Sequence, residues 1–151
     1  MKMLSGASPV EILLIEDNPG DIRLTREVLR DSAVVHHLSV AEDGVEAMAF
    51  LRRQGSYEHA PRPDLALLDL NLPRKDGREV LAEMKADPLL RRIPIVILTS
   101  SQAPQDILRA YDLYANCYIP KPMELEQYFA VVKSIVDFWI SIVQLPQEGA
   151  T

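Results

Sequence analysis

Short apolar runs recur along the chain and alternate with longer segments in which apolar and polar positions are mixed. Three runs are strong, at residues 12–15, 65–68 and 95–98, and two weaker ones lie at 38–40 and 117–119. Continuous apolar runs bounded by turn residues are typical of strands that are buried on both faces, as in a parallel sheet. The pattern therefore predicts five strands covered by helices on both sides.

Amphipathic segments with helix-start signals fill the spaces between these runs. Asn18, Asp43 and Asp76 each precede an acidic residue three positions later, a pattern that caps the first turn of a helix. Five strand–helix pairs result, at residues 10–31, 34–53, 64–87, 93–114 and 117–143. This alternation predicts a doubly wound α/β fold with a parallel sheet and right-handed crossovers.

Composition narrows the class of protein. The chain has 151 residues, 48% hydrophobic and 25% charged, with a formal net charge of −6, which fits one globular domain. An acidic chain without a basic cluster is a poor ligand for a nucleic-acid backbone or an anionic membrane. The longest uncharged stretch, residues 93–105, is shorter than the roughly 20 residues that a membrane helix needs. The single cysteine, Cys117, excludes an internal disulfide and suits the reducing cytoplasm.

Chemically active side chains follow four of the five predicted strands. Glu16 and Asp17 follow the first strand, Asp69 the third, Thr99 ends the fourth, and Lys121 follows the fifth. Sites of open α/β sheets form at this carboxyl edge. Three carboxylates at such short distances would repel one another unless a cation lies among them. A hard divalent cation such as Mg²⁺ or Mn²⁺ prefers oxygen ligands. A carboxylate nucleophile beside such a cation, a lysine and a hydroxyl is suited to phosphoryl transfer.

These residues stand in a pattern that resembles a known family. The elements Glu16-Asp17, Asp69-x-Asn71-x-Pro73-x-x-Asp76-Gly77, Thr99 and Tyr118-x-x-Lys121-Pro122 are similar to the signature of two-component response-regulator receiver domains. The resemblance covers residues 10–143 and implies a flavodoxin-like (βα)5 fold with strand order 2-1-3-4-5. It leaves only short tails at 1–9 and 144–151, so we expect a stand-alone receiver without an effector domain.

The resemblance implies a role for each residue of the pattern. Asp69 would accept a phosphoryl group from a phosphohistidine of a sensor histidine kinase. The chain would then be a signalling switch with weak self-catalysed transfer and hydrolysis, and not a turnover enzyme. The divalent cation would be held by the side chains of Glu16, Asp17 and Asp69 and by the backbone carbonyl of Asn71. Lys121 would pair with Asp69 or with its phosphoryl group.

The resemblance also implies a conformational switch and a partner. Thr99 would move toward the phosphoryl oxygen and Tyr118 would rotate into the vacated space, which would alter the surface of the fourth helix, fifth strand and fifth helix. The family often has a cis peptide bond at the position of Lys121–Pro122. A long exposed loop at 54–63 and an apolar last helix are similar to the regulators that partner bacterial phytochromes, so the expected kinase is a phytochrome.

The predicted last helix, residues 125–143, carries more apolar side chains than one buried face can hold. One stripe consists of Leu125, Phe129, Val132, Val136 and Val143, and Val131, Ile135, Phe138, Trp139 and Ile142 widen it. Surplus apolar area on a surface helix often marks an interface. We therefore expect a homodimer through the fourth helix, fifth strand and fifth helix; the alternative is that the extension folds back and buries Trp139.

Two features depart from the family pattern, and other functions compete with the receiver. The segment between Asp17 and Asp69 is long, and Pro120 lacks an N–H that would normally extend the fifth strand.

A carboxylate-nucleophile phosphatase would need an acid at position 71, where Asn71 stands. A pseudo-receiver that never carries phosphate would have lost an acid or the lysine. A flavin-binding module of similar topology would be revealed by its absorbance.

Overall fold

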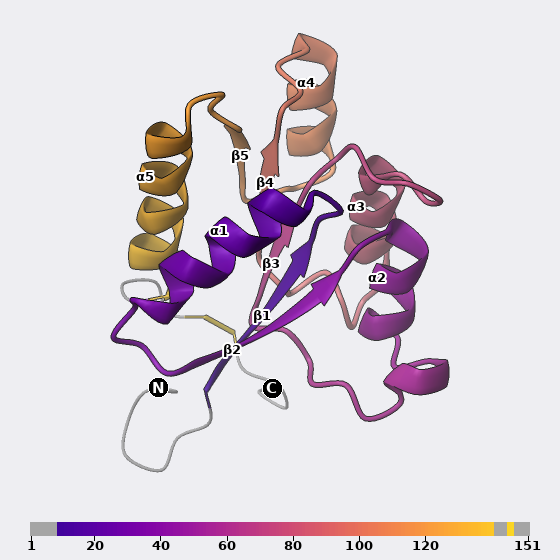
Figure 1. Ribbon diagram of the computed structural model, residues 1–151. Helices are drawn as coiled ribbons and strands as arrows, with labels where there is room; N and C mark the ends of the chain where they lie inside the picture. Colours follow the sequence, from indigo (N-terminus) through magenta and orange to yellow (C-terminus); the bar gives the residue numbers. More distant parts are fainter. Residues whose placement is uncertain (1–8, 141–144, 147–151) are drawn as a thin grey trace.

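The structure, a computed structural model, describes residues 9–140 and 145–146. The strands are β1 (Val10–Ile15), β2 (His36–Ala41), β3 (Leu65–Leu68), β4 (Ile95–Thr99) and β5 (Cys117–Pro120). The α-helices are α1 (Pro19–Arg30), α2 (Gly44–Leu51), α3 (Gly77–Ala86), α4 (Pro104–Asp112) and α5 (Leu125–Ile135). All strands are parallel and lie in the order β2-β1-β3-β4-β5 (Figure 1). The α/β fold and the strand order that the resemblance implied are therefore confirmed.

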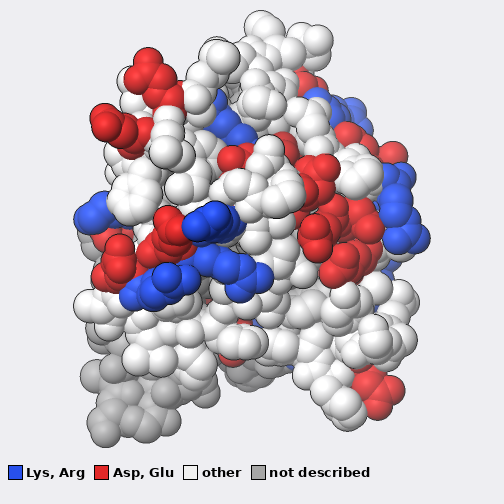
Figure 2. All heavy atoms as spheres, viewed as in Figure 1, with Lys and Arg blue, Asp and Glu red and all other residues white. Residues whose placement is uncertain are grey.

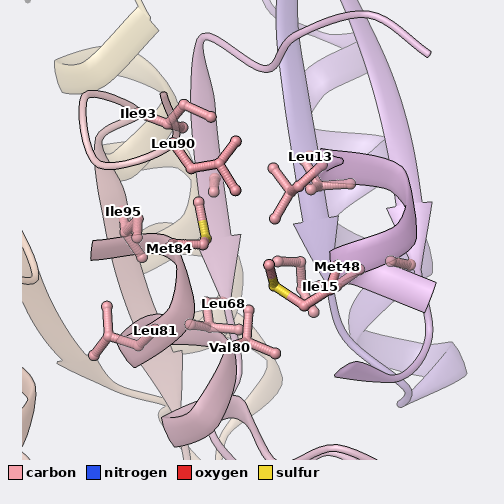
Figure 3. Close-up of a cluster of buried hydrophobic side chains, with 14 of the residues drawn as sticks. Leu13, Ile15, Met48, Leu68, Val80, Leu81, Met84, Leu90, Ile93 and Ile95 are labelled. Atoms are coloured by element: carbon pink, nitrogen blue, oxygen red, sulfur yellow. The ribbon is translucent and has the colours of Figure 1, made fainter. Parts of the chain in front are cut away.

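The alternation of side chains along each strand builds two cores, one on each face of the sheet. In β1, Leu13 and Ile15 belong to the core under α2 and α3, whereas Ile12 and Leu14 belong to the core under α1 and α5. Figure 3 shows the first of these cores, with Met84 of α3 among the side chains of the sheet. Each fully buried aliphatic side chain contributes roughly 1.5–3 kcal/mol, so the two cores hold the strand ends rigidly in place.

Capping residues fix where three helices begin. The side chains of Asn18, Asp43 and Asp76 each accept a hydrogen bond from a backbone N–H of the first helical turn, at 3.0, 2.7 and 3.0 Å, as predicted. α3 begins at Gly77, where a Cβ would lie 2.2 Å from the carbonyl oxygen of Asp69. Only glycine allows this close approach, and the first turn of α3 is thereby held against the end of β3.

The last helix differs from its prediction. α5 ends at Ile135 and continues as a π-helical turn, η2 (Val136–Ile140); positions 141–144, with the expected Ile142 and Val143, lie outside the described residues. The predicted stripe is wrong at its first member, because Leu125 is 64% exposed. Tyr128 takes the first buried position instead and packs against α1 and the sheet, since its ring is apolar although its hydroxyl is polar.

Two local expectations about the end of β5 are also wrong. Pro120 pairs with Thr99 as the last residue of β5, and the N–H of Lys121 continues the ladder to the carbonyl of Thr99 at 2.7 Å. The strand is undisturbed because β5 lies at the edge of the sheet, where a missing N–H can face away from the ladder. The Lys121–Pro122 peptide bond is trans, the isomer that X–Pro bonds favour.

The segment between α2 and β3 is the exposed loop that the sequence predicted. It contains one 3₁₀ turn, η1 (Gly55–Tyr57), and most of its residues up to 59 are exposed. Tyr57 anchors the loop, because its ring packs edge-on against Phe50 of α2 with centroids 5.5 Å apart. The extra length between Asp17 and Asp69 is therefore accommodated away from the carboxyl edge of the sheet.

Candidate functional site

The carboxyl ends of β1, β3 and β5 bring four of the predicted side chains together. Carboxylate oxygens of Glu16, Asp17 and Asp69 lie within 4.8 Å of one another. Lys121 Nζ donates hydrogen bonds to Glu16 Oε1 at 2.6 Å and to Asp69 Oδ2 at 3.1 Å. Glu16 and Asp69 are buried whereas Asp17 is exposed, so the cluster forms a notch that is open on one side.

Lys121 has a third partner that the sequence analysis missed. Asp21 Oδ2 accepts a hydrogen bond from Lys121 Nζ at 2.8 Å. Asp21 stands in the first turn of α1, where the pattern after Asn18 explains it as a helix-start acid. The available signal was its closeness in sequence to Asp17, because a helix that begins directly after β1 presents its first turn to the same edge.

The cluster holds more negative charge than Lys121 can balance. Burial raises the pKa of Glu16 to about 7, and the negative charge of Asp69 adds to this effect. The short bond to Lys121 opposes the shift but does not cancel it, because the ammonium is shared among three carboxylates. Burial alone would lower the pKa of Lys121, but its bonds to Asp21 and Glu16 outweigh burial and raise it, so the ammonium stays charged.

This donor set fits a divalent cation. Oxygen ligands from three acidic side chains at one point are what hard cations such as Mg²⁺ and Mn²⁺ prefer. The excess negative charge gives such a cation a favourable place, whereas without one the carboxylates repel each other. The chemistry of these residues therefore supports the predicted metal.

Asp69 is held from both its backbone and its side chain. Its N–H donates to the carbonyl of Ile15 at 3.0 Å, and its Oδ1 accepts the N–H of Asn71 at 3.2 Å. Oδ2 faces Lys121, so the two oxygens have different partners. Asn71 itself is exposed, two residues after Asp69 in the loop that leads to α3.

Thr99 and Tyr118 meet at a residue that the sequence did not single out. Thr99 is fully buried at the end of β4, and its Oγ1 accepts the N–H of Ser101 at 3.4 Å. Tyr118 is half-buried on β5, and its hydroxyl donates to the carbonyl of Ser101 at 2.8 Å. The N–H of Tyr118 donates to the hydroxyl of Tyr111 on α4 at 3.1 Å. Ser101 thus links Thr99 at the end of β4 to Tyr118 on β5.

A second ionic cluster lies beside the first, between α3 and α4. The guanidinium group of Arg78 donates two hydrogen bonds to the carboxylate of Asp106, at 2.8 and 2.7 Å, and one to Asp76 at 3.0 Å. Ser101 Oγ donates to Asp106 Oδ2 at 2.6 Å. The bonds from Arg78 and Ser101 hold the pKa of Asp106 well below its usual range. This cluster ties the first turn of α4 to the first turn of α3.

Charged side chains gather in two places on the face that Figure 2 shows, and acidic side chains also lie among the basic ones over α1. Figure 2 shows acidic side chains gathered near the start of α2 and basic side chains gathered over α1. The basic residues of that helix include Arg23, Arg26 and Arg30. Among the described residues, no helix is both long and apolar enough to cross a membrane.

Comparisons with known sequences agree with this geometry. The family profile of the response regulator receiver domain matches residues 12–133. Response regulator Rcp1 of Synechocystis sp. is 52% identical over 138 residues, which cover 91% of this chain and 94% of Rcp1. The probable methanogenesis regulatory protein FilR2 of Methanothrix harundinacea is 35% identical, over 91% of this chain and 88% of FilR2.

Solved structures give the same result. The crystal structure of Mn²⁺-bound response regulator Rcp1 superimposes with a TM-score of 0.91 at 52% identity, over 92% of this chain and all of that one. The phosphorylated cyanobacterial phytochrome response regulator RcpA gives a TM-score of 0.90 at 54% identity, over 93% of this chain and all of that one.

Proposed function

This chain belongs to the response regulator receiver domain family, and on that premise we propose that it is a signalling switch in which Asp69 accepts a phosphoryl group. One observation carries the proposal. Asp69 Oδ2 lies 3.1 Å from Lys121 Nζ, inside a cluster whose three carboxylates lie within 4.8 Å of one another. We assign the receiver to residues 10–143, with the segments 1–9 and 144–151 as tails.

The chemistry of this step follows from the charges around Asp69. A carboxylate oxygen attacks the phosphorus of a phosphohistidine; the new P–O bond forms as the P–N bond breaks, and the leaving imidazole takes up a proton. Lys121 brings a fixed positive charge to the phosphoryl oxygens. A divalent cation held by Glu16, Asp17, Asp69 and the Asn71 carbonyl would neutralise charge on the same oxygens.

The proposed phosphodonor is a sensor histidine kinase, and the similarity to RcpA, described as a phytochrome response regulator, favours a phytochrome kinase. The proposed setting is the cytoplasm, where such a kinase presents its phosphohistidine. Slow self-catalysed transfer and hydrolysis are the expected intrinsic activities, because the cluster supplies charge and positioning for a phosphoryl group on Asp69.

The proposed switch joins Thr99 and Tyr118 through Ser101. A phosphoryl group on Asp69 would attract the hydroxyl of Thr99, which now accepts a hydrogen bond from the Ser101 N–H. Any movement of Ser101 changes the acceptor of the Tyr118 hydroxyl. Tyr118 lies with its ring against the core, so the switch would be between this inward position and an outward one that reshapes the α4–β5–α5 face.

The same face is our proposed homodimer interface. An apolar groove of about 550 Å³ between β5 and α5 is lined by residues such as Ile119 and Val131, and Phe138 beside it is 51% exposed. Trp139 is half-buried and packs edge-on against Phe138. The chain therefore covers only part of this tryptophan, and the rest of its surface is left for a partner. Sedimentation should show a dimer; a monomer at high concentration, phosphorylated or not, would contradict it.

Intact mass measurement tests the acceptor directly. With Mg²⁺ and acetyl phosphate, the wild type should gain one phosphoryl adduct and Asp69→Asn should gain none. Asp112→Asn is the matched control, because Asp112 is an exposed acid at the end of α4 and should leave the adduct unchanged. An unmodified wild type would favour the pseudo-receiver, and equal adducts on wild type and Asp69→Asn would reject Asp69 as the acceptor.

A further inference from the structure

A basic pocket lies at the edge of the sheet opposite to Asp69. It is a cavity of about 540 Å³ formed by the end of α2, the segment before β3 and the turn between α3 and β4. Its charged lining consists of Arg52, Arg53, Arg62, Arg91, Arg92 and the single acid Asp87. Five of the sixteen basic residues of a chain with net charge −6 therefore gather in one cavity. The sequence shows no basic cluster, because these arginines come from three separate segments.

Part of this positive charge has no side-chain partner among the residues that the structure describes. Within the part of the chain that the structure describes, Arg62, Arg91 and Arg92 form no side-chain ion pair or hydrogen bond. Arg52 pairs with Glu83 at 3.1 Å outside the lining. Asp87 brings one negative charge to the lining, and its Oδ1 accepts the N–H of Leu89 at 2.8 Å. Guanidinium groups that share a cavity repel one another unless an anion joins them.

The pocket also has an apolar part. Leu51 and Leu90 are buried in its floor, and Leu89 on its rim is 78% exposed. Arg53, the second residue after α2, adopts a φ of 54° at a position where glycine is the usual residue. A cavity of this size matches small-molecule sites, and guanidinium groups bind phosphate in a two-pronged way and stack on planar rings.

We propose that this pocket binds a nucleotide, with its phosphates among the arginines and its base against the apolar part. Such a site would give the chain a second input, separate from phosphorylation at Asp69. The two places lie at opposite ends of β3, whose four residues span roughly 13 Å at about 3.3 Å per residue. Binding should therefore be the same in the wild type and in Asp69→Asn, so a failure of the acceptor proposal would leave this one standing.

Titration calorimetry of the full chain with ATP and with GTP tests the proposal. At low salt, the wild type should bind at least one of them, and Arg62→Ala/Arg91→Ala should weaken binding at least tenfold. The matched control is Arg23→Ala/Arg26→Ala on α1, which removes the same charge elsewhere and should change affinity less than twofold. Pyrophosphate should compete, whereas adenosine and guanosine should bind weakly.

Three outcomes would overturn it. The first is no binding of either nucleotide by the wild type at millimolar concentration; the arginines would then serve only the negative carboxyl ends of α2 and α3. The second is equal weakening in both double variants, which would indicate attraction to net charge and no pocket. The third is binding of a polyglutamate peptide, but not of nucleotides, with the same arginine dependence; the ligand would then be an acidic peptide. Thermal unfolding of both double variants checks that each is folded.

Discussion

Two ionic clusters lie side by side at the carboxyl edge of the sheet, and they differ in how far their charges are balanced. In the first, Lys121 pairs with Glu16, Asp21 and Asp69, and Asp17 adds a fourth carboxylate nearby. In the second, Arg78 serves two carboxylates with a geometry that matches its planar shape. The first cluster therefore keeps a larger excess of negative charge than the second, in which one guanidinium group faces only two carboxylates.

The carboxyl pKa shifts of the two clusters have opposite signs, because burial dominates at Glu16 and hydrogen bonds dominate at Asp106. Burial among other carboxylates raises the pKa of Glu16 to about 7. The hydrogen bonds from Arg78 and Ser101 lower the pKa of Asp106. A raised carboxyl pKa shows that folding destabilises the ionised form of the group, and a lowered pKa shows that folding stabilises it. The difference separates a cluster suited to binding from one that serves as a brace.

Removing Lys121 should have the largest effect on stability. Lys121→Met leaves Glu16 and Asp69 buried without their cation, and we expect a loss of about 3 kcal/mol in the free energy of unfolding at pH 8 without divalent cations. Urea denaturation measures this loss, and saturating Mg²⁺ should recover part of it.

The control for that variant is Lys133→Met. Lys133 pairs with Asp137 at 3.1 Å, but both side chains are well exposed, so the pair contributes no more than about 0.5 kcal/mol. Equal losses in the two variants would show that the Lys121 cluster is no more dependent on its cation than a surface pair.

The pH dependence of the first cluster should be smaller but distinctive. Because the folded-state pKa of Glu16 is near 7 and its ordinary value is 4.5, the folded chain keeps a proton that the unfolded chain has released. Without divalent cations, the free energy of unfolding should therefore fall by about 2 kcal/mol as pH rises from about 4.5 to about 7. Urea denaturation across this range in a chelator measures the slope.

Glu16→Gln should abolish this fall, and Mg²⁺ should flatten it by displacing the proton. Glu79→Gln, an exposed acid on α3, should keep the wild-type slope. A wild-type stability that stays level or rises between pH 5 and 7 would mean that Lys121 balances Glu16 fully.

The part of this arrangement that the sequence predicts is the part fixed by local pattern. The strands follow from runs of apolar residues, and the caps at Asn18, Asp43 and Asp76 follow from side chains that bond within their own turn. The convergence of Asp69 and Lys121 follows from parallel strands that share one edge.

The rest depends on how helices are rotated and placed on the sheet, which no local pattern encodes. Arg78 meets Asp106 across 28 positions, and Asp21 meets Lys121 across 100. The burial of Tyr128 in place of Leu125 has the same origin, because the rotation of α5 decides which side chains face α1.

A change in the second cluster, at Asp106, should give the smallest loss of stability and the opposite dependence of stability on pH. Asp106→Asn keeps the shape of the side chain but removes its charge, and we expect a loss of about 1 kcal/mol at pH 7, because a partly buried charged hydrogen bond is lost. Since the pKa of Asp106 is lowered in the folded chain, its stabilisation is present above its ordinary pKa and is lost as pH falls below it. The wild type and the variant should therefore converge in urea denaturation as pH drops below about 4, while Asp112→Asn should differ little from the wild type at any pH. A gap between wild type and Asp106→Asn that persists unchanged in acid would show that shape, and not charge, holds α4 to α3.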